Sequence, residues 1–144
     1  MVNLCKKIIK KRNIMEKVAF YACFKNQNKH SIEYFLNKIS DWCLLKNYDY
    51  TVYIDKVDNR LHMNDRKELK LLKNDIESGE YSKIIVNDIK HLSRDVVETL
   101  NFLLFLEKNN CDIECVDGTD LKLYKKIIEK FNKNKEEIER WITK

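Results

Sequence analysis

Proline is absent from the 144 residues, and glycine occurs only twice, at Gly79 and Gly118. This scarcity excludes collagen-like chains, flexible linkers and glycine-rich nucleotide-binding loops. No window approaches the ~18 consecutive apolar residues that span a bilayer. Residues 1–17 lack both a continuous apolar stretch and a small-residue cleavage site. We therefore expect a cytoplasmic protein with no membrane segment and no secretory signal.

Charge is distributed unevenly along the chain. The formal net charge is +5, and residues 1–17 alone hold six basic residues against one acidic residue, whereas residues 18–144 hold 22 of each sign. The body is therefore not a basic clamp for nucleic acid. The arm formed by residues 1–17 is a candidate for phosphate contacts, although such segments are more often solvated tails. Its candidate DNA-binding residues are Lys6, Lys7, Lys10, Lys11 and Arg12.

Five cysteines are spread through the chain, and their odd number, with no secretory signal, predicts reduced thiols. Cys111 and Cys115 are four residues apart, but they lie in a strand-like run. No second Cys/His pair stands at zinc-finger spacing, and His30 and His62 lie in polar segments. We therefore expect no metal site and no cofactor.

Strand-like and helix-like patterns alternate along the body. Short apolar or β-branched runs predict strands, and apolar residues three and four apart predict amphipathic helices. The predicted strands are 18–24, 48–55, 83–89 and 112–116. The predicted helices are 32–46 with Ser31 as N-cap, a helix capped by Asp65 and ended by Gly79, 95–108, and a long helix at 119–142.

This order predicts the α/β class, with an open, mostly parallel sheet of four to five strands and helices on both faces. We expect a basic N-terminal arm at 1–17 and one domain at 18–144. Apolar residues nearly encircle helix 95–108, which predicts burial on more than one side.

The apolar stripe of helix 119–142 continues to the end of the sequence. The sheet is too small to cover the end of that stripe, whereas a second subunit would cover it. We therefore expect a homodimer through this helix. The predicted interface residues are Tyr124, Ile127, Ile128, Phe131 and Ile138.

Four short blocks follow one another in this frame over about residues 18–140. They are Tyr-Ala-Cys-Phe-Lys-Asn at 21–26, Ser-Ile-Glu at 31–33, Asp55 followed by Asp-Arg-Lys-Glu-Leu at 65–69, and His-Leu-Ser-Arg at 91–94. In this order they resemble the catalytic domain of the serine recombinases, the resolvase/invertase family. That family has Tyr-Ala-Arg-Val-Ser-Thr, Ser-Leu-Glu, Asp with Asp-Arg-Pro-x-Leu, and Arg-Leu-Ser-Arg, so a resolvase-like fold is implied.

The resemblance also implies a reaction. In the family a serine hydroxyl attacks a DNA phosphodiester, forms a 5′-phosphoserine and releases a 3′-oxygen, while arginines bind the phosphate. Arg66 and Arg94 stand at matching positions and are candidate phosphate ligands. The alternative, weighed equally, is that they pair with acids such as Asp55 or Asp95.

The sequence departs from the family pattern where the chemistry lies. Lys25 stands at the serine position, Cys23 at the arginine two residues earlier, and Lys90 with His91 at an Asp-Arg pair. No serine occurs in 18–30, and Ser31 and Ser93 match family serines that are not nucleophiles. We interpret them as a helix cap and a loop hydrogen-bonding residue. The candidate catalytic set is Lys25, Cys23, Arg66, Lys90, His91 and Arg94.

Together these features predict a serine-recombinase-like domain linked to DNA recombination or mobile elements, without strand-cleaving activity. It would act as a dimerising regulatory module whose candidate partners are DNA and an active recombinase subunit. The alternative is an active recombinase or nuclease in which Lys25 or Cys23 is a non-standard nucleophile. A third interpretation is a decayed remnant. No DNA-binding module follows the last helix, so we expect it to be absent or supplied by another polypeptide.

Overall fold

Four parallel strands form the central sheet of the computed structural model, which describes residues 15–25, 29–58, 60–118 and 121–142. The strands are β1 (Glu16–Cys23), β2 (Tyr48–Asp55), β3 (Lys83–Val86) and β4 (Asp112–Cys115), in the spatial order β2-β1-β3-β4. All three pairs of neighbours are parallel. The predicted α/β class with an open parallel sheet is confirmed.

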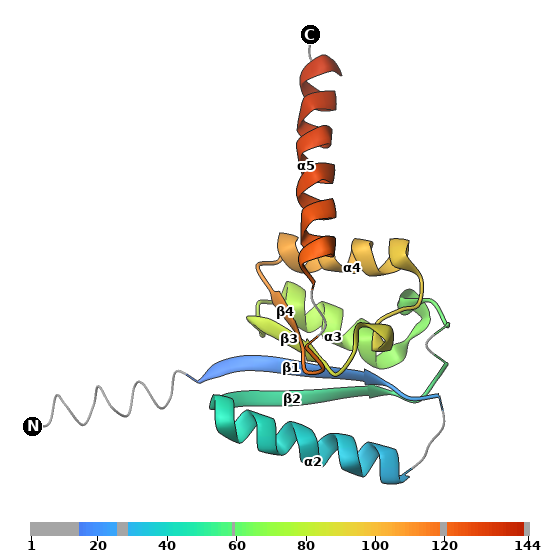
Figure 1. Ribbon diagram of the computed structural model, residues 1–144, viewed down its shortest axis with the longest axis vertical. Helices are drawn as coiled ribbons and strands as arrows, with labels where there is room; N and C mark the ends of the chain where they lie inside the picture. The colour runs from blue at the N-terminus through green and yellow to red at the C-terminus, as the bar shows by residue number, and fades with distance from the viewer. Residues whose placement is uncertain (1–14, 26–28, 59, 119–120, 143–144) are drawn as a thin grey trace, which may run out of the picture.

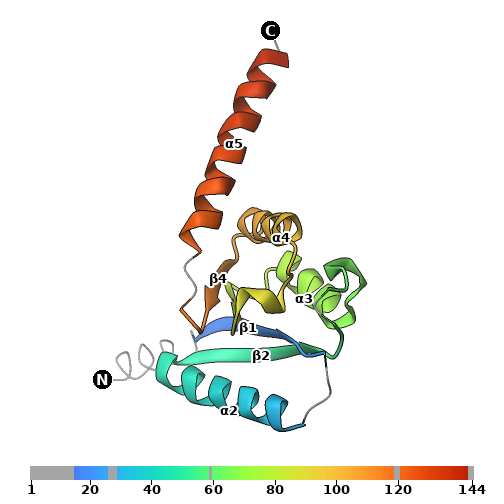
Figure 2. The same ribbon diagram turned by 45° about the vertical axis from the view of Figure 1, so that its right-hand side comes forward.

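Helices cover both faces of the sheet. α2 (Lys29–Lys46) lies on one face, and α3 (Lys67–Glu77) and α4 (Val96–Lys108) lie on the other (Figure 1). α5 (Lys122–Ile142) starts beside α4 and projects away from the sheet (Figure 2). Within the described segments, no helix is both long and apolar enough to cross a membrane.

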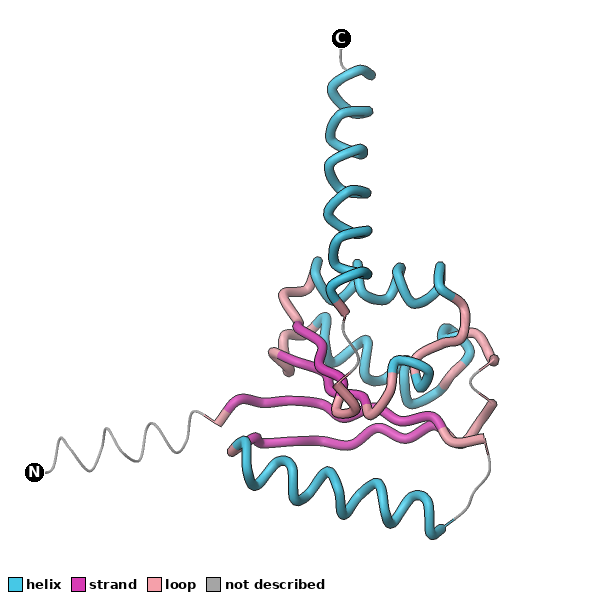
Figure 3. Tube along the Cα trace, viewed as in Figure 1, coloured by secondary structure: helices cyan, strands magenta, loops and turns pink. Residues whose placement is uncertain are grey.

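Side chains of the central strand β1 alternate between two apolar layers (Figure 3 shows this strand between its neighbours). Phe20 and Ala22 pack in the layer that contains α2, whereas Ala19 and Tyr21 pack in the layer that contains α3 and α4. Both sets are fully buried. Burial on two faces explains why β1 has a continuous apolar sequence rather than an alternating one.

Three predicted boundaries are corrected by the structure. α2 begins at Lys29, so Ser31 lies inside its first turn and is not its N-cap. β3 ends at Val86 rather than at residue 89, because a 3-10 turn, η2 (Ile89–His91), follows it. β1 begins at Glu16, whose carboxylate accepts a hydrogen bond from the Ser82 hydroxyl at 2.9 Å. The first strand therefore includes the last two residues of the predicted arm.

The start of α3 is also corrected. Asp65 belongs to a separate 3-10 turn, η1 (Met63–Asp65), and the N-cap position is Arg66, whose side chain makes no capping bond. The Asp55 carboxylate at the end of β2 supplies the cap instead. It accepts hydrogen bonds from the backbone N–H groups of Glu68 at 2.9 Å and Leu69 at 3.0 Å. A residue distant in sequence thus satisfies the helix terminus.

The burial of α4 differs from the prediction in its first turn. Val96 and Val97 are exposed, whereas Phe102, Leu103 and Leu106 are buried against the sheet. The expectation that this helix is buried on more than one side is therefore wrong at its N-terminal end. The reason is that the apolar side chains there face away from the only layer that α4 covers.

Candidate functional site

A buried polar network lies beneath the carboxyl edge of the sheet. The Tyr21 hydroxyl donates to Asp55 Oδ2 at 2.7 Å, and Arg66 Nη1 donates to the Tyr21 hydroxyl at 3.4 Å. The fully buried Arg66 also donates to the backbone carbonyls of Leu61 at 3.1 Å and His91 at 2.9 Å. Burial raises the pKa of Tyr21, which keeps its hydroxyl protonated. Arg66 therefore ties two loops to the sheet and is connected to Asp55 through Tyr21.

Cys23 and His91 lie side by side at the ends of β1 and η2. The Cys23 backbone N–H donates to His91 Nδ1 at 3.0 Å, which assigns the ring proton to Nε2. Burial lowers the pKa of His91, so the ring is neutral. The Cys23 thiol donates to the Val57 carbonyl at 3.1 Å, and burial raises its pKa. Both groups are thus held uncharged, and neither supplies the positive charge of an arginine.

The His91 ring packs between two phenylalanine rings. Its centroid lies 5.4 Å from that of Phe24 in an edge-to-face contact and 6.4 Å from that of Phe35 in a stacked contact. A pocket of about 510 Å³ opens beside these rings. Its lining comprises Phe24, His30, Ser31, Tyr34, Phe35, Lys38, Asn87 and His91. Such a lining offers aromatic faces and one lysine where an arginine cluster would be needed to hold a phosphate.

Lys25 lies at the surface, beyond the end of β1. Its side chain is 65% exposed, and its Nζ is 3.6 Å from Asp58 Oδ2. Arg60 Nη2 is 2.9 Å from the same oxygen, and hydrogen bonds from Arg60 hold the pKa of Asp58 well below its usual range. Asp58 is therefore a carboxylate that pairs with two cations. An ion-paired ammonium has no lone pair with which to attack phosphorus.

The remaining candidate residues lie on the segment from η2 to α4. Lys90 and Arg94 are exposed there. The Ser93 hydroxyl accepts a hydrogen bond from the Asp95 backbone N–H at 3.0 Å, which confirms Ser93 as a loop hydrogen-bonding residue. Asp95 in turn caps α4 by accepting from the Val97 backbone N–H at 2.9 Å. The structure thus brings Cys23, Arg66 and His91 together and leaves Lys25, Lys90 and Arg94 at the surface.

Two residues of this region escaped the sequence analysis. Tyr21 is the only hydroxyl-bearing residue of the apolar run in β1, and a buried hydroxyl needs a partner, so a signal for it existed. Asp58 lies in a polar loop without periodicity. Its pairing with Lys25 depends on how two separate loops meet, which no local pattern encodes.

The predicted dimer residues fall into two groups. Ile127 and Phe131 are 40% and 55% exposed, whereas Ile128 is buried in the core of its own subunit and Tyr124 packs half-buried against that core. The side chain of Ile138 lies outside the described residues, as do the candidate DNA-binding residues Lys6, Lys7, Lys10, Lys11 and Arg12. The exposed stripe of α5 continues to Trp141, which is 82% exposed.

The model of the family described as Resolvase, N terminal domain, matches residues 23–143. The chain belongs to this family. The match begins at Cys23 at the end of β1, includes Arg66 and His91, and extends through α5. No curated protein matches this resolvase-family sequence.

Solved structures share the fold of this resolvase-family domain. The N-terminal catalytic domain of TP901-1 integrase is 21% identical with a TM-score of 0.68, and the match covers 86% of this chain and 99% of that one. A resolvase family site-specific recombinase from Streptococcus pneumoniae is 19% identical with a TM-score of 0.63, covering 89% and 97%. The C-terminal catalytic domain of ISC1926 TnpA, an IS607-like serine recombinase, is 18% identical with a TM-score of 0.63, covering 80% and 78%. These similarities establish that the chain has the fold of a serine-recombinase catalytic domain.

Proposed function

We propose that this resolvase-family domain acts in DNA recombination or in a mobile element as a dimerising module without strand-cleaving activity. The observation that carries the proposal is that Lys25, which the sequence resemblance aligns with the family's serine, is exposed and paired with Asp58. No serine stands elsewhere in 18–30 to replace it.

The chemistry of strand exchange supports this proposal. Exchange requires a covalent link that is reversed by a DNA 3′-oxygen, as a phosphoserine can be. Attack by Lys25 would form a phosphoramidate, which does not suit a reversible exchange. The Cys23 thiol belongs to a class of group that can act as a nucleophile. However, Cys23 is only 7% exposed, and its thiol donates a hydrogen bond to the Val57 carbonyl. Burial raises its pKa and so removes the thiolate that would be the nucleophile.

The site also has fewer arginines available to bind phosphate than the family pattern implies. Arg66 is fully buried and donates to backbone carbonyls, which suits a positioning residue better than a phosphate ligand. Arg94 remains exposed and stays a candidate ligand for DNA phosphate. A module of this kind would bind DNA weakly by itself and would gain affinity from a second subunit or an active recombinase.

A suicide-substrate assay tests the missing activity. The purified chain is incubated with a nicked DNA duplex, and denaturing gels and mass spectrometry detect any covalent protein–DNA species. We expect no adduct, together with a salt-sensitive mobility shift of the duplex. A matched Arg94→Gln variant is expected to weaken that shift.

The second candidate function is strand cleavage with a non-standard nucleophile. The exposure of Lys25 at the carboxyl edge of the sheet favours it, because a DNA phosphate could reach that amine. An adduct that disappears in Lys25→Ala but persists in a control Lys56→Ala variant would establish this function and overturn the first. Lys56 is a suitable control because it is an exposed lysine just after β2.

A further inference from the structure

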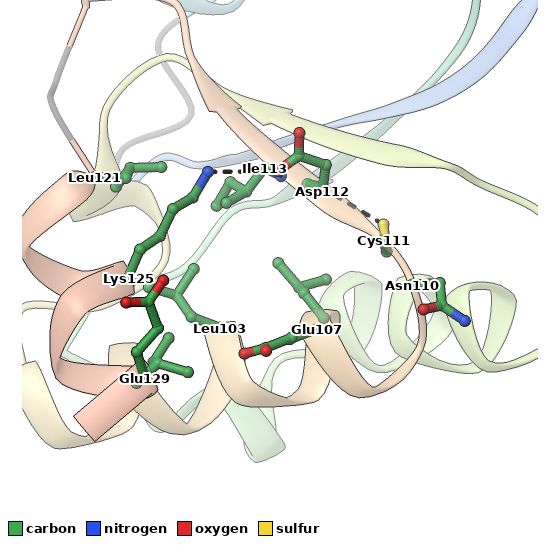
Figure 4. Close-up of a pocket in the computed structure, with 11 residues that line it drawn as sticks. Leu103, Glu107, Asn110, Cys111, Asp112, Ile113, Leu121, Lys125 and Glu129 are labelled. Carbon is green, nitrogen blue, oxygen red and sulfur yellow. Dashed lines mark hydrogen bonds and ion pairs between the residues drawn. The ribbon is translucent and has the colours of Figure 1, made fainter. Parts of the chain in front are cut away.

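An apolar groove runs between α4, β4 and α5, on the side of the molecule away from the candidate site. It has a volume of about 450 Å³. Leu103 of α4, Ile113 of β4 and Leu121, which directly precedes α5, line it (Figure 4). Ile128 of α5 also belongs to its lining. All four side chains are at least nine-tenths buried, so the groove is part of the core surface rather than a loose edge.

The rim of the groove is acidic. Glu107 from α4 and Glu129 from α5 lie on facing walls with Leu103 between them (Figure 4). Asp112 adds a third carboxylate, which Lys125 Nζ approaches at 3.9 Å. One lysine against three carboxylates leaves the rim with negative charge. An occupant of this groove should therefore carry apolar side chains flanked by cations.

The amino edge of the sheet places the start of the chain's body close to this groove. The Lys17 carbonyl accepts from the Ser82 N–H at 3.1 Å, and the Ser82 carbonyl accepts from the Asp112 N–H at 2.9 Å. Asp112 on the groove rim is therefore two strand spacings, about 10 Å, from the first residues of β1. Fully extended, the four steps of chain from Glu16 back to Arg12 reach about 14 Å, so Arg12 can reach the rim at Asp112 and residues 4–12 can lie in the groove.

The sequence of that segment has the required chemistry. Leu4 and Ile8 are four residues apart, the spacing of one helical face, and Ile9 follows Ile8 directly. Lys6 and Lys7 stand between these apolar residues, and Lys10, Lys11 and Arg12 follow them. We propose that residues 4–12 dock in the groove of their own chain, with the apolar side chains on its floor and the lysines beside Glu107 and Glu129. The docked arm would then withhold its lysines from DNA phosphate.

Zero-length carbodiimide cross-linking of the full chain tests this proposal, because it joins a lysine amine to a carboxylate only when the two are in contact. A mixture of ¹⁴N-labelled and ¹⁵N-labelled chains separates links within one chain from links between copies by mass. We expect links from Lys6, Lys7, Lys10 or Lys11 to Glu107 or Glu129 within one chain. Links to Glu77, an exposed glutamate on α3, should be rare.

A paired substitution distinguishes docking from general attraction. Ile8→Ser with Ile9→Ser removes the apolar anchors but keeps every lysine and glutamate, and is expected to lower the yield of these links by roughly fivefold. The matched control, Asn3→Ser with Asn13→Ser, should leave the yield unchanged. Links found only between copies would assign the groove to a second copy. That result would overturn the proposal. So would a cross-link yield that is the same with and without the two isoleucine substitutions.

Discussion

The carboxylate of Asp55 connects the end of β2 to β1 and to the first turn of α3. It accepts from the Tyr21 hydroxyl and from the backbone N–H groups of Glu68 and Leu69. Asp55→Asn removes the charge that strengthens these bonds, so we expect the free energy of unfolding to fall by about 2 kcal/mol. Urea unfolding measures the loss, and the exposed Asp49 on β2 supplies a control as Asp49→Asn. Equal losses in the two variants would contradict the capping role.

His91 predicts how acid affects the fold. Burial lowers its pKa below the ordinary value of 6.5, so below that pH the unfolded chain binds the proton before the folded chain does. Stability from this group is therefore complete above pH 6.5 and is lost as the pH falls through the folded-state pKa. His91→Asn keeps an acceptor for the Cys23 N–H but does not titrate, so its free energy of unfolding should fall less between pH 7 and about 5.

Carboxylates also titrate in that range, so only the difference between the two proteins is informative. His30→Asn is the matched control, because His30 is exposed on α2. Wild-type and His91→Asn curves of equal slope would show that the ring is accessible to protons in the fold.

At the scale of elements, the C-terminus of α3 has a strict backbone requirement. Gly79 has φ +78°, its N–H donates to the Ile76 carbonyl at 3.0 Å, and the Glu80 N–H donates to the Asp75 carbonyl at 3.1 Å. A Cβ at Gly79 would meet nothing within 4 Å, so the cost of Gly79→Ala is conformational. We expect a loss of about 1 kcal/mol in thermal or urea unfolding. The neighbouring Glu80→Ala should cost far less.

The elements also show which information the sequence carries. Both ends of strand 48–55 were predicted correctly, as was the end of α3 at Gly79. These features were predictable because hydrophobic periodicity and turn-forming residues are properties of the local sequence. The start of α3 was missed because Asp55, in another element, satisfies it. The site divides in the same way. Sequence placed its residues at strand ends, but the burial of Arg66 depends on carbonyls from two loops that only the folded chain brings together.

At the scale of the whole molecule, the free face of α5 predicts association. Phe131 is more than half exposed on a helix that extends beyond the sheet (Figure 1). If a partner covers this face, Phe131→Glu places a charge in the interface and should shift the chain from dimer to monomer in sedimentation velocity. Lys133→Glu, two residues along and on another side of α5, should leave the distribution unchanged. A wild-type chain that stays monomeric at all concentrations would contradict the dimer.

The two tryptophans occupy opposite environments. Trp42 lies half-buried on α2, with its ring 5.9 Å from that of Phe20 in β1, whereas Trp141 is exposed in the last turn of α5. An α-helix of 21 residues is about 30 Å long, so these two fluorophores report on distant regions. In Trp141→Phe the remaining tryptophan, Trp42, reports by fluorescence on unfolding. In Trp42→Phe the remaining tryptophan, Trp141, reports on events at the tip of α5. The chain thus contains its own spectroscopic means of separating folding from assembly.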